Sequence, residues 1–97
     1  MKIGKYEYFI SDKPAKKLYT IVNSKKIYFG ATAYEHFKDL TGLLPKSSNH
    51  GDEVRRKSYL ARATKIKDKA GNLTANDPSS PNYHALRILW SWNGKNI

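Results

Sequence analysis

The first third of the chain alternates apolar and polar residues in the manner of β-strands. Turn-forming residues divide it into segments, at residues 11–14 and again at Asn23-Ser24. Because Asn tolerates a positive φ, the second division predicts a tight hairpin. The pattern therefore predicts three antiparallel strands. Their aromatic and β-branched runs are Tyr6–Ile10, Leu18–Val22 and Lys25–Phe29.

Beyond residue 31 the apolar positions take a helical period. Thr32 and Glu35 have the spacing of a capping box, in which the hydroxyl accepts from the third amide and the carboxylate reaches back. Gly42 is a natural C-terminal stop for a helix that begins there. This stretch predicts a first helix over residues 32–42. The apolar face of that helix would carry Ala33, Phe37 and Leu40.

Two further helices are predicted in the second half. One starts at Asp52, whose charge complements the helix dipole, and runs to about Lys67. Arg56 falls near its apolar side, so either the side chain snorkels or the helix is shorter. The other has Ser80 as its cap and Pro81 as its first residue, and ends at Asn93-Gly94.

Strands followed by helices indicate the α+β class. We predict one small domain, residues 1–97, with a three-stranded antiparallel sheet followed by two to three helices. Residues 1–16 would form an N-terminal extension or an edge strand.

The net charge of +10 is unevenly distributed. Residues 1–29 hold seven lysines and two acids, and residues 54–76 hold seven basic residues and one acid. The segment between them, residues 30–53, has a net charge of −2. If the two basic segments meet in space, they form a face that attracts phosphate or an acidic partner. The alternative is that scattered lysines only keep a small domain soluble.

The second basic segment combines arginines with an aromatic residue on one predicted helix face. Arg55, Tyr59 and Arg62 follow the spacing i, i+4, i+7, which can place guanidinium groups on phosphates beside a ring. Such binding would be mostly non-specific and salt-sensitive. Alternatively, Tyr59 lies in the core and the arginines are solvated or pair with Asp52 and Glu53. The candidate residues for binding nucleic acid or an acidic partner are Arg55, Arg56, Tyr59, Arg62 and Lys65.

Two tryptophans close the last predicted helix. Trp90 and Trp92 are candidates for a protein contact, because at helical geometry they point about 200° apart and one of them could then be exposed while the other is buried. The alternative is that both anchor the rim of the core.

The sequence lacks the residue patterns that metal, cofactor and catalytic sites require. There are no cysteines, and the three histidines have no metal-ligand spacing, so we expect no metal and no cofactor. We predict His36 on the surface, His50 in a loop and His84 at the start of a helix. We assign no catalytic residue and expect no small-molecule substrate. Without a long apolar run or a signal peptide, we expect neither a membrane partner nor secretion by that route.

One enzyme family bears a faint likeness to the strand region. Lys17-Leu18-Tyr19 and Tyr28-Phe29-Gly30 resemble the paired strand motifs of GIY-YIG nucleases, which are followed by a helix. Those enzymes use the two tyrosines, an arginine on the next helix and a metal-binding glutamate. Here Lys17 replaces the first glycine, no arginine precedes Arg55, and no glutamate follows Glu53. A nuclease is therefore the third hypothesis, and we expect no enzyme.

A broader resemblance covers residues 17–92. Three ordered elements, Lys26–Ala31, Arg55–Arg62 and Ser80–Trp90, are similar to those of a family of short basic proteins encoded by bacteriophages and large DNA viruses. The resemblance implies a viral protein in the virion or the host cytoplasm, and it supplies no catalytic residues. We expect a minor capsid or capsid-lining protein that contacts coat subunits and whose basic strip faces either nucleic acid or an acidic protein. The alternative is a soluble, non-specific nucleic-acid-binding accessory protein.

Overall fold

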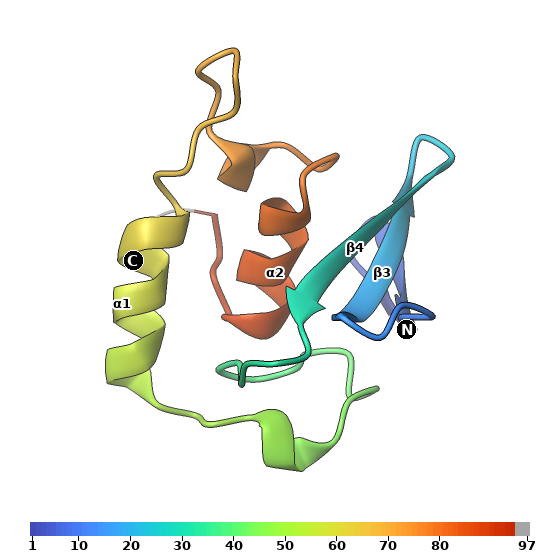
Figure 1. The fold of residues 1–97 in the computed structure, drawn as a ribbon, viewed down its shortest axis with the longest axis vertical. Helices are drawn as coiled ribbons and strands as arrows, with labels where there is room; N and C mark the ends of the chain where they lie inside the picture. Colours follow the sequence, from blue (N-terminus) through green and yellow to red (C-terminus); the bar gives the residue numbers. More distant parts are fainter. Residues whose placement is uncertain (95–97) are drawn as a thin grey trace.

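The computed structural model describes residues 1–94, and these form an α+β fold with a four-stranded antiparallel sheet and two α-helices (Figure 1). Residues 95–97 lie outside the described part. The strands follow one another across the sheet in sequence order. They are β1 (Lys2–Ile3), β2 (Tyr6–Ile10), β3 (Lys16–Val22) and β4 (Lys25–Ala31).

The sheet has four strands, one more than the three predicted. β1 pairs Lys2 with Glu7 and Ile3 with Tyr6, so residues 1–16 supply both an edge strand and the strand beside it. A two-residue strand is too short to show any alternation, which is why the pattern missed it. The predicted hairpin between β3 and β4 is confirmed. Asn23 and Ser24 have φ values of 51° and 66°, as a tight hairpin loop requires.

Both later helices begin where predicted. α1 (Glu53–Ala63) starts after Asp52, whose carboxylate accepts from the amides of Val54 and Arg55. α2 (Pro81–Leu89) starts after Ser80, whose hydroxyl accepts from the amide of Asn82. Both end earlier than predicted, α1 at Ala63 instead of Lys67 and α2 at Leu89 instead of residue 93. Two 3₁₀ turns complete the described chain, η1 (Lys46–Ser48) and η2 (Thr74–Asn76).

The helix predicted over residues 32–42 is wrong, because these residues form a loop. The amides of Lys38 and Leu40 donate to the carbonyls of Leu89 and Ile88 at the end of α2. The side chain of Asp39 accepts from several local groups of residues 41–44. The two backbone bonds satisfy carbonyl groups at the end of α2. The bonds to the Asp39 side chain compete with a local helix.

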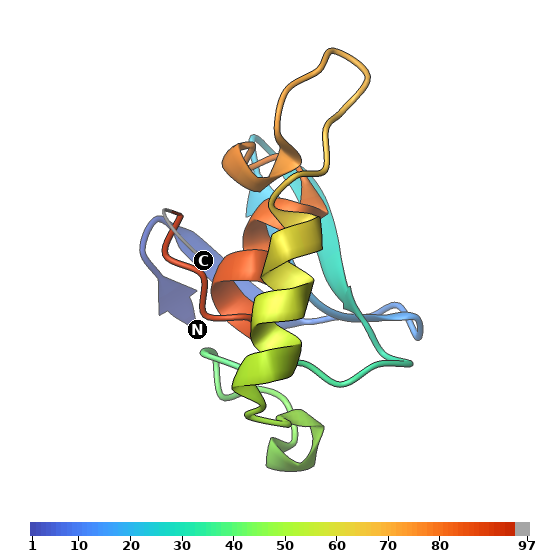
Figure 2. The same ribbon diagram turned by 90° about the vertical axis from the view of Figure 1, so that its left-hand side faces the viewer.

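The fold has three layers, with α2 between the sheet and α1 (Figure 1, Figure 2). The core is formed where α2 meets the inner face of the sheet, with Leu18, Phe29, Leu60, Leu86 and Leu89 almost fully buried. Both helices lie on the same side of the sheet (Figure 1). The opposite side has no helix over it within residues 1–94. No helix of this part is long and apolar enough to cross a membrane.

Candidate functional site

A cleft opens between α1, α2 and the ends of β3 and β4. Its volume is about 700 Å³, within the range of pockets that hold small ligands. The loop at residues 34–36 forms a further wall. Most of the interior is apolar. The main apolar side chains are Phe29, Tyr59, Ile66, Ala85, Leu89 and Trp90.

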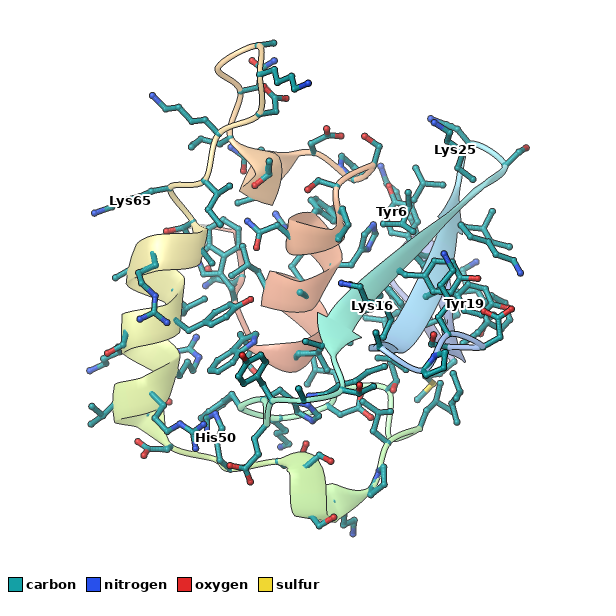
Figure 3. All side chains as sticks on the ribbon, in the orientation of Figure 1. Tyr6, Lys16, Tyr19, Lys25, His50 and Lys65 are labelled. Atoms are coloured by element: carbon teal, nitrogen blue, oxygen red, sulfur yellow. The ribbon has the colours of Figure 1, made fainter. Side chains whose placement is uncertain are left out.

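Exposed basic side chains surround this cleft. Lys16 comes from the start of β3, which pairs with the end of β4 near α2 (Figure 3), while Arg55 and Arg62 come from α1. Glu35 is the one acidic residue among the described lining residues, and it accepts from Arg55 Nη1 at 3.2 Å. The two basic sequence segments therefore meet at this cleft, as one of our alternatives expected. We call Lys16, Arg55 and Arg62 the cationic rim.

A buried cluster of polar side chains holds the loop at residues 34–36 in place. Lys17 Nζ lies 2.9 Å from His36 Nδ1 and also donates to the carbonyl of Tyr34. His36 Nε2 contacts Asn49 Oδ1, which accepts from the amide of Asp39 as well. Burial lowers the pKa of both Lys17 and His36, and the Lys17 charge lowers the His36 pKa further. A neutral His36 fits these contacts, with Nδ1 accepting and Nε2–H donating.

The prediction that His36 lies on the surface was wrong, since it is 1% exposed. Its burial depends on Lys17 and Asn49, which are 19 and 13 residues away in the chain. No local pattern could have shown these contacts. Lys16 and Lys17 were likewise absent from the predicted site, because only the packing of the sheet against the helices brings them to the cleft.

Three of the five predicted binding residues line the cleft, namely Arg55, Tyr59 and Arg62. The ring of Tyr59 stacks on Trp90 with centroids 4.0 Å apart and an interplanar angle of 4°. Tyr59 therefore belongs both to the core and to the cleft wall. Arg55 pairs with Glu35 and not with Asp52 or Glu53, the partners considered from the sequence.

The other two predicted residues do not line the cleft. Arg56 is turned toward the end of α2, where Nε donates to the carbonyl of Trp90 at 2.9 Å and Nη2 to that of Ser91 at 2.8 Å. It also pairs with Glu53 on its own helix. Lys65 follows the end of α1 and extends away from the cleft (Figure 3). Arg56 is thus a structural residue, and Lys65 is a surface cation.

Of the two alternatives for the tryptophans, the one with an exposed ring for a protein contact is wrong. Trp90 and Trp92 are 8% and 7% exposed, which agrees with the alternative that both anchor the core rim. Ser91 between them has a φ of 52°, so the helical spacing no longer applies there. Arg87 lies over the Trp92 ring at 4.9 Å.

Partly exposed aromatic side chains lie instead on the side of the sheet away from the helices, where Figure 3 labels Tyr19. Phe9, Tyr19 and Tyr28 form a cross-strand ladder with centroid distances of 5.1 and 5.3 Å. Ile21 is 48% exposed. We call Phe9, Tyr19, Ile21 and Tyr28 the outer aromatic face. Lysines border it, with Lys26 Nζ 5.0 Å from the centre of the Tyr19 ring.

The nuclease motif does not assemble as that resemblance requires. Tyr19 and Tyr28 are neighbours on β3 and β4, but the helix that should follow is a loop. The Tyr28 hydroxyl donates to Asp12 at 2.7 Å, and this bond raises the pKa of Tyr28 to about 12. Among residues 1–94 no group of three His, Cys, Asp or Glu is placed to hold a metal ion.

His50 and His84, which we predicted in a loop and at a helix start, occupy those positions. His84 is fully buried, with Nδ1 2.9 Å from the Tyr8 hydroxyl and Nε2 2.7 Å from the Pro78 carbonyl oxygen. Neither of these histidines lines the cleft.

Comparisons with protein families, with curated proteins and with solved structures found no match. A function for the chain therefore rests on the chemistry of its own residues.

Proposed function

We propose that the chain is a small, non-enzymatic viral structural protein whose cleft binds nucleic acid with little sequence preference. The observation that carries this proposal is the cationic rim. Lys16, Arg55 and Arg62 come from two distant segments of the chain and surround one cleft, opposed only by Glu35 among the described lining residues.

Lysine and arginine are the usual contacts of proteins to nucleic-acid phosphates. Each phosphate that they neutralise releases condensed counterions, so binding weakens steeply as salt rises. Phosphate contacts carry no sequence information. A partner held mainly by the cationic rim would therefore be bound through its backbone.

The test is a comparison of two variants with equal net charge. Arg55→Ala/Arg62→Ala removes two charges from the cationic rim, while Lys25→Ala/Lys46→Ala removes two exposed charges that do not line the cleft. Oligonucleotide binding is measured by fluorescence anisotropy at low salt. We expect the cleft variant to bind at least about ten-fold more weakly and the control to bind nearly as the parent does. An equal loss in both variants would mean that only overall charge matters.

A contact with a coat subunit of a virus particle is the second part of the proposal, and the outer aromatic face supports the protein contact. Clustered aromatic side chains are enriched at protein interfaces, and bordering lysines favour an acidic partner surface. We propose that this face, and not the tryptophans, contacts a coat subunit. Mass spectrometry of purified virus particles should find the chain in stoichiometric amounts. Its absence from particles, with binding by the cleft retained, would favour the soluble accessory protein instead.

A further inference from the structure

The cleft has an interior that phosphate contacts do not explain. Its rim is basic, but its walls are formed by apolar and aromatic side chains. Ala85 and Leu89 of α2 contribute to the interior, together with Tyr59 of α1. A phosphate group is strongly hydrated and gains nothing from such walls. A ligand that fills the cleft needs a flat apolar part as well as negative charge.

We propose that the cleft accepts an unpaired base, so that the protein binds single-stranded nucleic acid in preference to duplex. This inference rests on the proposed function and adds the class of nucleic acid. The phosphates on either side of the inserted base would lie at the cationic rim, within reach of Lys16, Arg55 and Arg62.

The aromatic wall of the cleft supports an inserted base. Tyr59 is held flat against Trp90 by their parallel stacking, so its ring forms a rigid part of the wall. Every base has an apolar π-face, and stacking on an aromatic side chain contributes about 1–3 kcal/mol per base. Within a duplex, both faces of a base are covered by its neighbours. A paired base would have to be unstacked and flipped out before it could enter, which costs a few kcal/mol.

The few polar groups inside predict little discrimination between bases. Besides the tyrosine hydroxyls, the uncharged polar side chains among the described lining residues are Ser58, Asn82 and the neutral His36. Both ring nitrogens of His36 are already in contact with Lys17 and Asn49. The amide nitrogen of Asn82 donates to the carbonyl of Ala63 at 2.7 Å and lies 3.0 Å from Thr74 Oγ1. These bonds fix the Asn82 side chain to the protein. Recognition of a base edge needs several such groups aimed at the ligand.

The experiment compares single-stranded oligo(dT) of about 12 nucleotides, within the usual site sizes for single strands, with a duplex of the same length. Ser58→Leu fills the cleft from the exposed side of α1 and leaves every cation in place. Ala61→Leu is the matched control, since Ala61 is exposed on the same helix but does not line the cleft. Affinity is followed by anisotropy. In a Trp92→Phe background the remaining tryptophan, Trp90, lines the cleft, so its fluorescence reports on the cleft itself.

We expect the parent protein to bind the single strand at least about ten-fold more tightly than the duplex, with tryptophan quenching by the single strand. Ser58→Leu should lose this preference and Ala61→Leu should keep it. Equal, salt-sensitive binding of both forms by the parent would overturn the inference and leave the proposed function standing. No binding of either form would overturn both. Tighter binding of an acidic, phenylalanine-containing peptide, lost in Ser58→Leu, would assign the cleft to a protein partner.

Discussion

Replacing Arg56 with methionine removes the guanidinium group that joins α1 to the end of α2. Its side chain is 18% exposed and donates to the carbonyls of Trp90 and Ser91. Hydrogen bonds from a charged donor contribute about 1.5–3 kcal/mol each. The ion pair with Glu53 adds little, because Glu53 is exposed. We therefore expect the free energy of unfolding to fall by about 3 kcal/mol or more.

The matched change is Arg55→Met, one residue earlier on the same helix. Arg55 is half exposed, and its one ion-pair partner within residues 1–94 is the exposed carboxylate of Glu35, so its loss should cost less than about 1 kcal/mol. Urea unfolding followed by tryptophan fluorescence measures both variants. A loss of 3 kcal/mol corresponds to a fall in Tm of about 12 °C or more for a domain of this size. An Arg56→Met protein within about 1 kcal/mol of the parent would refute the assignment of Arg56 to the structure.

Three further predictions concern other parts of the chain. Gly30→Ala should lower the free energy of unfolding by about 2–4 kcal/mol, because its φ is +78° and a Cβ would lie 2.8 Å from Leu89 Cδ1. Gly71→Ala, at a φ of +85° with open space around it, should lower the free energy of unfolding only by the cost of its left-handed backbone conformation. Urea titration measures both variants. Burial lowers the pKa of His84, so its contribution to stability should be present above the unfolded value of 6.5 and be lost as pH falls below it. Thermal melts from pH 8 to 5 would show this, and a His84→Gln protein with unchanged acid sensitivity would contradict it. Incubation with Mg²⁺ and plasmid should give no nicking, whereas nicking that disappears in Tyr28→Phe would revive the nuclease hypothesis.

Local signals in the sequence were sufficient for the elements that carry their own turn or cap. Asn23 and Ser24 indicated the hairpin, and Ser80 with Pro81 indicated the start of α2. The failed helix at residues 32–42 had a plausible cap and three spaced apolar residues. The amides of Lys38 and Leu40 instead donate to Leu89 and Ile88 at the end of α2, 51 and 48 residues further along the chain. Such distant partners cannot be read from a local period.

The candidate site was predictable only along one helix. Helical spacing brought Arg55, Tyr59 and Arg62 together, and all three line the cleft. The period also placed Arg56 toward the apolar side, which agrees with its partly buried position. Lys16 joins the other two rim cations through the packing of the sheet against the helices. A single helix pattern holds no information about that packing.

The salt dependence of oligonucleotide binding tests the central claim most directly. Each phosphate neutralised on a single strand contributes about 0.7 to the slope of log K against log salt. Removing Arg55 and Arg62 by alanine substitution should therefore reduce the magnitude of that slope by about 1.4 relative to the parent. The substitutions Lys25→Ala and Lys46→Ala should leave the slope close to the parent value. A parent protein whose affinity does not change with salt, or a slope unaltered by loss of Arg55 and Arg62, would contradict binding at the cationic rim.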